Sequence, residues 1–265
     1  MNGERPSPLG VYDAARYWDL AFDDETPDEV AFVQALAERT TVRRVYEPGC
    51  GGGRLLVALN EAGFDVSGCD LAAAMVARTR ERLPAKAAKR IAFGDMRTYR
   101  PRAKVDLAIC PVNTFRHLLT EADALAHLDA VADAVRPGGH YAIGLHLLPP
   151  DADEADGERW SVETDAERVT VTLRVIAFDR RRRIERLRFS LHVRTFDAGG
   201  DRIQRARSEF DYRIYNAMQI RSLLRKSPRW TLESVHDFWW DLDDPLPLSD
   251  DRGDTVLLLR RTDAE

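Results

Sequence analysis

Residues 45–54 form the segment best suited to hold a ligand, because four of its ten positions are glycine (Gly49, Gly51, Gly52 and Gly53). Glycines at alternate positions let the backbone turn sharply and let a ligand approach where a Cβ would otherwise stand. The segment ends an apolar run typical of a strand and begins a helical pattern, whose first N–H groups are free to face polar ligand atoms. A tight turn without a ligand is the plain alternative.

Asp70 follows Gly53 by seventeen residues and ends the next apolar run. A carboxylate at this point of an α/β sheet can accept hydrogen bonds from both hydroxyls of a ribose. The glycine loop and Asp70 together predict an adenosine-containing ligand at the switch point of the sheet. A dinucleotide fingerprint calls for a further glycine where this chain has Arg54, so the spacing does not favour a dinucleotide.

The elements that must position these residues alternate between short apolar runs and helical patterns. Strands at this spacing with helices between them indicate an α/β, doubly wound, Rossmann-like sheet that is mostly parallel. Two N-terminal helices are expected within residues 11–40. We expect strands near 45–47, 64–69, 91–93, 105–110 and 140–148, helices over 55–62, 72–83 and 118–135, and then a helix near 216–224 with strands near 232–238 and 255–259.

At this point the chain resembles the class I S-adenosylmethionine-dependent methyltransferases, in the branch that acts on small molecules. The resemblance covers about residues 42–148 and extends more loosely to Tyr12, Asp13 and Tyr17 and to the final helix and strands, which would form the antiparallel C-terminal hairpin of this sheet. Its motifs are the glycine loop, Asp70-Leu71, Gly94-Asp95-Met96, residues 105–110 and Arg136-Pro137-Gly138-Gly139.

The resemblance implies that the cofactor is S-adenosyl-L-methionine, with S-adenosyl-L-homocysteine as its product. Glu47 would lie near the methionine amino group, with Gly49 and Gly51 beneath the methionine and ribose. Asp70 would hold the ribose hydroxyls, and Cys110 would close the methionine side through its backbone.

Four further residues would surround the rest of the cofactor. Asp95 would accept from the adenine amino group, while Leu71 and Met96 would pack on the adenine faces. Tyr17 resembles the N-terminal tyrosine that caps the cofactor in such enzymes. Two of these residues have structural alternatives: Asp95 as a helix N-cap after Gly94, and Tyr17 as an ordinary packing residue of an amphipathic helix.

Catalytic candidates are fewer, because the sulfonium arrives already activated and the protein mainly aligns a nucleophile. His117, after the fourth strand, and His146, near the end of the fifth, are candidate bases, and each has the alternative of a structural histidine. The sequence has no Asn-Pro-Pro-Tyr tetrad and no acid cluster typical of magnesium-dependent catechol enzymes. Cys50, Cys69 and Cys110 are expected to line a crevice, and no metal site is expected.

After Pro149 and Pro150 the pattern changes. An acidic loop is expected over 151–165, followed by three antiparallel strands within 169–178, 184–196 and 203–212. Residues 168–207 contain twelve arginines against four acids, and alternation predicts Arg186, Arg188, His192 and Arg194 on one strand face. This face could bind an anionic substrate, it could pair with an acidic partner such as 151–165 or a second subunit, or it could be solvated. Pairing with an acidic partner and solvation, taken together, are favoured over binding of an anionic substrate.

These observations divide the chain into a helical cap (1–41), an S-adenosylmethionine-binding domain (42–150 and 214–265) and an insertion for substrate or oligomer contacts (151–213). The net charge of −5 and 44% apolar residues are typical of a globular protein, with no nucleic-acid partner, membrane segment or signal peptide expected and a cytoplasmic location as the default.

The function predicted is methyl transfer to an N or O atom of a small-molecule acceptor. The alternatives are an RNA or protein methyltransferase that docks through the arginine-rich strands, and a non-catalytic S-adenosylmethionine-binding module. The inserted strands are also a candidate surface for a homodimer.

Overall fold

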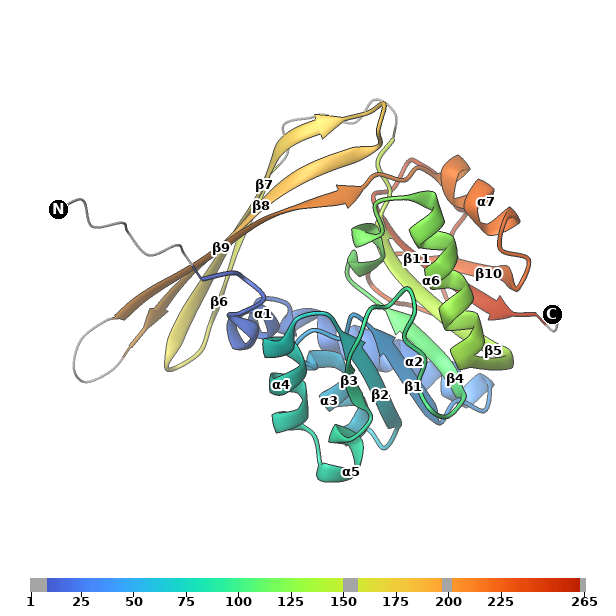
Figure 1. Ribbon diagram of the computed structural model, residues 1–265, viewed down its shortest axis with the longest axis horizontal. Coiled ribbons are helices and arrows are strands. Elements are labelled where there is room, and N and C mark those ends of the chain that lie inside the picture. The colour runs from blue at the N-terminus through green and yellow to red at the C-terminus, as the bar shows by residue number, and fades with distance from the viewer. Residues whose placement is uncertain (1–8, 150–156, 197–201, 263–265) are drawn as a thin grey trace.

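The structure is a computed structural model that describes residues 9–149, 157–196 and 202–262. The larger of its two sheets has seven strands in the order β10-β11-β5-β4-β1-β2-β3 (Figure 1). β1 to β5 are parallel, whereas β11 is antiparallel to both of its neighbours. This confirms the expected doubly wound sheet with an antiparallel C-terminal hairpin. The strands are β1 (Arg44–Pro48), β2 (Asp65–Asp70), β3 (Ile91–Phe93), β4 (Val105–Cys110), β5 (Val135–His146), β10 (Trp230–His236) and β11 (Asp254–Arg261).

Helices cover both faces of this sheet, because each carries one apolar stripe that has to be buried. One face packs against α2, α3, α4 and α5, and the other against α6 and α7. No helix in the described ranges is long and apolar enough to cross a membrane. The helices are α2 (Thr26–Arg39), α3 (Arg54–Glu61), α4 (Ala73–Arg82), α5 (Ala85–Ala88), α6 (Glu121–Ala134) and α7 (Ala217–Arg225).

Two element boundaries differ from the expectation. α6 begins at Glu121 instead of residue 118, because the Thr120 hydroxyl accepts a hydrogen bond from the Asp123 N–H (3.0 Å) and caps the helix there. β5 begins at Val135, directly after α6, instead of after the Pro-Gly-Gly turn. A register shift between β4 and β5 takes up the extra residues of that turn.

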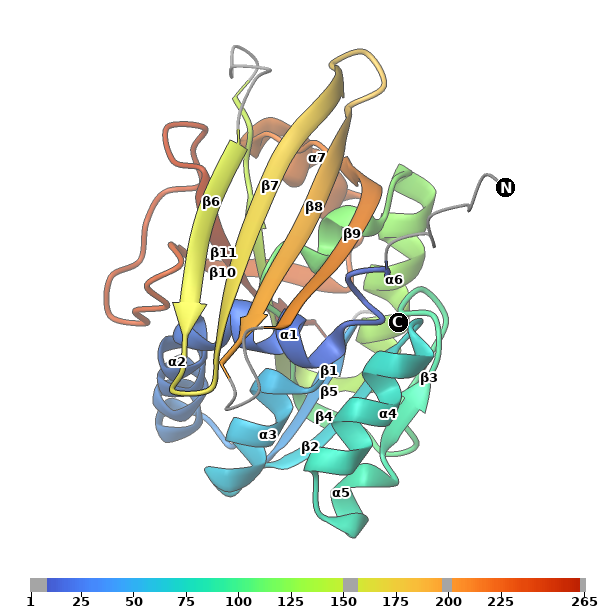
Figure 2. The same cartoon turned by 90° about the vertical axis from the view of Figure 1, so that its left-hand side faces the viewer.

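The second sheet is antiparallel, and Figure 2 shows its four strands side by side with α1 (Ala15–Ala21) next to them. The three expected strands are present, as β7 (Glu167–Asp179), β8 (Ile184–Thr195) and β9 (Arg202–Arg213). The expected loop over 151–165 is wrong in part, because β6 (Gly157–Glu163) is a strand paired with β7. The partly buried Trp160 and Val162 alternate with exposed residues there, and the acidic composition concealed that pattern. Residues 151–156 and the expected turn at 197–201 lie outside the described residues.

The inner face of the second sheet packs on the N-terminal segment. Val169, Phe189 and Leu191 share a buried cluster with Val11 and Ala21. The segment before α1 runs along β9, where the Arg207 N–H donates to the Leu9 carbonyl (2.8 Å). The sheet therefore covers the larger sheet through α1 rather than directly.

The outer face carries the arginines, as the alternation predicted: Leu187, Phe189, Leu191 and Val193 are buried, whereas Arg186 and Arg194 are exposed. Several of the arginines are paired with acids of the same sheet. Arg186 bonds Asp211 (2.7 Å), and both Arg188 and Arg207 bond Glu209 (2.9 and 3.0 Å). Of the three interpretations considered, this pattern favours pairing with acids, although the partners lie mostly on the neighbouring strand.

A buried ion pair ties the second sheet to the larger one. Arg116, in the short helix η2 (Thr114–His117) after β4, bonds the carboxylate of Glu185 on β8. Its Nε donates to the Arg213 carbonyl (3.0 Å), and its guanidinium lies 5.0 Å from the centre of the Tyr212 ring. Both charged side chains are almost fully buried, so each depends on the other for its solvation.

We expect Glu185→Leu to lower the free energy of unfolding by about 3–5 kcal/mol, because it leaves the Arg116 charge buried without its partner. The double variant Glu185→Leu/Arg116→Met should recover a large part of this loss, since no unpaired charge remains. Urea unfolding of the two single variants and the double variant measures the coupling. Strictly additive losses would contradict a linked pair.

Candidate active site

The glycine loop between β1 and α3 has the backbone geometry that its sequence predicted. Gly49 has a φ of +72°, and a Cβ there would lie 2.5 Å from Cγ2 of Thr114. Gly51 has a φ of +54°, and nothing lies within 4 Å of the place its Cβ would take. Side chains are disfavoured at both positions by the backbone conformation. At Gly51 the loop therefore presents its backbone, without a side chain, to an open space.

Arg54, which departs from the dinucleotide pattern, has a structural role. Its guanidinium forms two hydrogen bonds to the fully buried carboxylate of Glu29 on α2 (2.6 and 2.9 Å) and one to the Thr26 hydroxyl (2.7 Å). A bidentate pair of this kind fixes both partners. It holds the first residue of α3, and with it the end of the glycine loop, against α2.

Glu47 is a buried acid without a hydrogen-bond partner for its Oε2 atom among the described residues. Burial raises the pKa of Glu47 well above its usual value, although the nearby charge of Arg54 lowers it. A buried acceptor left without a partner costs roughly 1–3 kcal/mol. A ligand that brings an ammonium or another donor to this atom would remove that cost.

Asp70 closes the other side of the loop. Its two oxygens accept hydrogen bonds from the N–H groups of Gly51 (2.9 Å) and Ala72 (2.8 Å). Together with the glycine loop it borders a cavity of about 350 Å³. The structure thus brings together at this cavity five of the residues selected from the sequence: Gly49, Gly51, Asp70, Leu71 and Met96.

Four other residues selected for the cofactor lie outside that lining, and Glu47 is one of them. Tyr17 packs in the buried cluster of the second sheet. The Asp95 carboxylate is held by the Arg97 guanidinium (2.6 Å) and backbone N–H (2.8 Å), and the hydrogen bonds from Arg97 lower its pKa. The Cys110 thiol is in the core, where burial raises its pKa to about 12. The local turn geometry resembles the capping alternative for Asp95, and a backbone role for Cys110 stays a prediction.

Of the two N-terminal tyrosines, Tyr12 rather than Tyr17 borders this cavity. The Tyr12 hydroxyl lies 3.0 Å from Nε2 of His117. Burial raises the pKa of Tyr12 well above its usual value, so the phenol stays protonated. Tyr12 belongs to the N-terminal Tyr-Asp pair already noted in the sequence, and that pair was the signal that could have identified it.

A second cavity of about 630 Å³ adjoins the first and shares Trp18, Gly49 and Thr114 with it. Much of its wall is aromatic and comes from the N-terminal segment, the second sheet and the loop after β10. Glu47 also lines it, so an acceptor in this cavity would lie beside the cofactor's methionine end. Its aromatic residues are Trp18, Phe22, Trp160, Phe189, Tyr212 and Phe238.

Carboxylates from three distant segments meet in this second cavity. Glu25 comes from η1 (Asp23–Glu25), Glu158 from β6 and Asp254 from the start of β11. Burial, together with the charges of Glu29, Asp254 and Glu158, raises the pKa of Glu25 to about 7 against the opposing effect of Arg54. The sequence offers no sign of this convergence, because each of the three acids is more than ninety residues from the next along the chain.

His117, one of the two candidate bases, lines the cofactor cavity rather than the second one. Burial and the charge of Arg116 lower its pKa to about 4. It is therefore neutral near pH 7, with its Nε2 atom engaged by Tyr12. This arrangement suits a residue that positions Tyr12.

His146, the other candidate, does line the second cavity, and neighbours occupy both of its ring nitrogens. Asn113 Oδ1 accepts a hydrogen bond from the backbone N–H of His146 (2.9 Å), so the side-chain amide nitrogen of Asn113 faces Nδ1 of the ring (3.3 Å) as a donor. Nδ1 is then the acceptor, and Nε2 carries the hydrogen that points to Asp254 (3.2 Å). His146 thus orients the Asp254 carboxylate at the cavity.

Comparison with known proteins agrees with this geometry. Residues 45–139 match the family model described as a methyltransferase domain. A ubiquinone biosynthesis O-methyltransferase of Bordetella avium is 42% identical over 64 residues, a match that spans 22% of this chain and only 27% of that relative.

Two solved structures share the fold over most of the chain. One is CalS10, an amino pentose methyltransferase from Micromonospora echinaspora (TM-score 0.69, 22% identity, covering 98% of this chain and 100% of that chain). The other is the sugar N-methyltransferase KedS8 from Streptoalloteichus sp ATCC 53650 (TM-score 0.69, 20% identity, covering 99% and 98%). At these identities the likeness establishes the fold.

Residues 45–139 therefore carry a methyltransferase domain, and the sheet order is that of the fold shared with these methyltransferases. The CalS10 structure holds S-adenosylmethionine. The residues present fit this cofactor, since the unpaired Oε2 of Glu47 matches its amino group and Gly51 leaves room for close approach. When bound, it supplies a methyl group already activated on a sulfonium.

We expect S-adenosylhomocysteine to raise the melting temperature by several degrees, at about 2–4 °C per kcal/mol of binding energy for a chain of this size, and NADH to leave it unchanged.

Asp70→Ala should weaken S-adenosylhomocysteine binding at least about tenfold, the scale of a lost charge-assisted hydrogen bond. Asp65→Ala, at the other end of β2, is the matched control. Equal affinities for the two variants in a calorimetric titration would argue against the ribose role.

A matched tyrosine pair tests which residue caps the cofactor. Tyr12→Phe should weaken S-adenosylhomocysteine binding about three- to tenfold, because it removes a hydrogen bond worth about 1 kcal/mol at the cavity. Tyr17→Phe should change the affinity less than about twofold. The reverse order in the same titration would return the capping role to Tyr17.

Proposed function

We propose that the protein methylates a nitrogen atom of a small-molecule amine. The observation that carries this proposal is the second cavity, whose lining combines aromatic side chains with the partly buried Glu25 and the more exposed Glu158 and Asp254. Carboxylates attract an ammonium group, and aromatic faces also favour cations. An anionic acceptor, such as a carboxylate or a phenolate, would meet repulsion there.

The cations in the cavity do not reverse this charge. Arg54 is bound to Glu29, and His146 faces Asp254. Among the described lining residues this leaves Arg159, which is exposed, against the three carboxylates and the nearby Asp24. Two of the fold relatives are named as an amino pentose methyltransferase and a sugar N-methyltransferase, which supports an amine acceptor here as well.

An amine attacks through its lone pair, so it must be neutral at the moment of transfer. An acceptor that binds as an ammonium would give one proton to Glu25 and become a neutral amine. Its lone pair would take the methyl group that bound S-adenosylmethionine supplies, so the methylated product would leave as an ammonium ion together with S-adenosylhomocysteine, and Glu25 would release its proton to water. Glu25 suits this role because its pKa of about 7 makes it a carboxylate at slightly alkaline pH. Glu47, the glycine loop and Asp70 would hold the cofactor, and the aromatic walls would exclude water.

The alternatives receive less support from the structure. Docking of RNA or protein on the arginine-rich strands would compete with the ion pairs that Arg186, Arg188 and Arg207 form within the sheet. A non-catalytic module does not require a carboxylate-lined cavity beside the cofactor. A homodimer through the inserted strands stays a prediction.

Glu25→Gln tests the acceptor class and the proton acceptor together. Released S-adenosylhomocysteine is measured with a panel of small amino sugars and aliphatic amines, each beside the analogue with hydroxyl in place of amine. With the wild type, we expect turnover of amines only, with kcat/KM rising as the pH passes about 7, since below that value Glu25 already holds a proton.

Glu25→Gln should lower kcat about a hundredfold at pH 7.5 and shift the rise to higher pH, toward the pKa of the amine itself. Asp24→Asn removes the same charge from the neighbouring residue and should change kcat less than about threefold. Turnover of the hydroxyl analogues alone would contradict the proposal, as would an unchanged pH profile for Glu25→Gln.

A further inference from the structure

A third cavity, unrelated to the methyl-transfer site, lies at the opposite end of the parallel strands. It is the largest of the three described here, at about 1070 Å³, and Arg44, Asp65 and Val105, the first residues of β1, β2 and β4, line it. With a rise of about 3.3 Å per residue, β2 separates this end from Asp70 by roughly 20 Å. A ligand here would not touch the cofactor.

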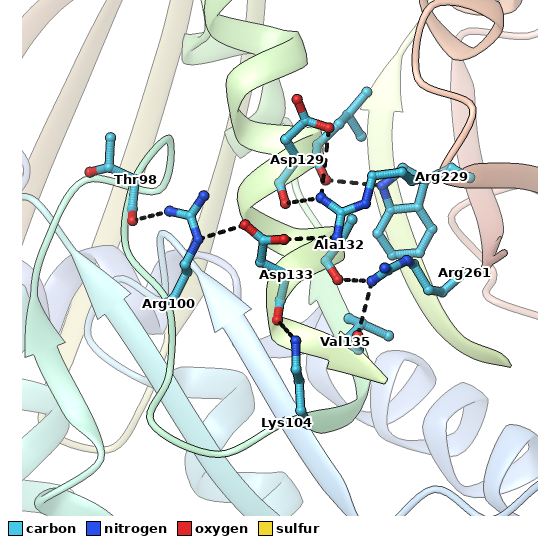
Figure 3. A network of polar contacts seen from close by, with 11 residues as sticks. Thr98, Arg100, Lys104, Asp129, Ala132, Asp133, Val135, Arg229 and Arg261 are labelled. Carbon is cyan, nitrogen blue, oxygen red and sulfur yellow. Dashed lines mark hydrogen bonds and ion pairs between the residues drawn. The ribbon is translucent and has the colours of Figure 1, made fainter. Parts of the chain in front are cut away.

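The cavity exists because one crossover lacks a helix. The fully described stretch from Gly94 to Lys104 joins β3 to β4 as a loop, whereas α6 covers β4 and β5 on the same face (Figure 1). Asp133 on α6 anchors that loop, because Arg100 bonds its carboxylate (2.8 Å) and Lys104 its carbonyl (Figure 3). The face of β2 and β3 beyond α6 therefore stays hollow, with Ala92, Tyr99 and Val105 among its lining.

The charge of this cavity is strongly positive. Seven of its lining residues are Arg or Lys, and Asp65 is the one acid among them. Arg90 pairs with Asp65 (3.1 Å), and Arg100 pairs with Asp133. Arg80 donates only to the neutral Ile91 carbonyl. In the described ranges no carboxylate pairs with the remaining four, which are Arg44, Lys86, Lys89 and Arg102.

This cluster differs from the basic face of the second sheet. The arginines on the outer face of the second sheet face acids on the neighbouring strand, at 2.7 Å for Arg186 and Asp211. The whole chain carries a net charge of −5. Five cations without a carboxylate partner around one hollow thus form a local excess, which like-charge repulsion disfavours until an anion enters.

We propose that this basic cavity, defined by Arg44, Arg80, Lys86, Lys89 and Arg102, binds a small polyphosphorylated compound. Lys and Arg side chains from four separate segments surround the hollow, as several phosphate groups on one ligand require. Its partly apolar floor at Ala92 and Tyr99 leaves room for an organic group. The site is independent of the proposed methyl transfer. A ligand bound there would tether the protein or regulate its activity.

The test is calorimetric titration of the full chain with tripolyphosphate and with UTP at low salt, in the presence of saturating S-adenosylhomocysteine to block the cofactor site. We expect one saturable site per chain for tripolyphosphate, with affinity that falls as salt is added. Equal or tighter binding of UTP identifies a phosphate ester as the ligand, and weaker binding of UTP identifies inorganic polyphosphate.

Lys86→Glu/Lys89→Glu should weaken tripolyphosphate binding at least about tenfold, and Arg44→Gln should weaken it severalfold. Arg181→Glu/Arg182→Glu, the same charge change in the exposed turn between β7 and β8, is the matched control and should leave binding unchanged. The melting-temperature shift with S-adenosylhomocysteine verifies that each variant is folded.

Three outcomes would overturn the proposal. The first is no saturable tripolyphosphate binding by the wild type, and the second is an equal loss in the control variant. The third is a single-stranded oligouridine that binds more tightly than UTP and is lost in Lys86→Glu/Lys89→Glu, since that would assign the cavity to RNA. None of these outcomes bears on amine methylation, which is measured separately.

Discussion

The buried pair of Arg54 and Glu29 is the interaction on which the active site depends. Arg54 is the first residue of α3, and both of its guanidinium bonds to carboxylate go to Glu29 on α2. The glycine loop is thereby fixed at its helical end, while Glu47 beside it has no guanidinium of its own. Glu29 and Glu47 are thus two buried acids that both lie in the electrostatic field of Arg54. A positively charged ligand group at Glu47 therefore completes a charge balance that the protein alone leaves unfinished.

The second sheet completes the other half of the site. The acceptor cavity is bounded by the larger sheet, by Trp18 and Phe22 of the N-terminal segment, and by Trp160 and Phe189 of the second sheet. None of these parts encloses it alone. The buried pair of Arg116 and Glu185 links the second sheet to η2, whose first residue, Thr114, lines both cavities. Enclosure of the reacting groups, which excludes water, thus depends on a contact outside the cavity itself.

Sequence reasoning succeeded where the signal is local. The glycine loop and Asp70 are set by the backbone needs of a few neighbouring residues, so their spacing predicted a shared cavity. Reasoning from the sequence failed where packing brings together segments that are far apart along the chain. Nothing in the sequence near Glu25 indicates that Glu158 and Asp254 lie beside it. Tyr12 and Tyr17 are equivalent as residue types, and only the direction of the chain before α1 decides which of them faces the cavity.

The count of arginines over residues 168–207 shows a further limit of reasoning from the sequence. A window that ends at residue 207 stops just before Glu209 and Asp211, the acids that pair with three of the outer arginines. Most basic residues of the basic cavity lie within residues 78–104, which hold ten Arg or Lys against two acids, an excess that the sequence analysis did not single out. The fold places carboxylates at one end of the parallel strands and unpaired cations at the other. A net charge of −5 therefore conceals two opposite local fields, and the amine and the polyphosphate that we propose as ligands match these fields in charge.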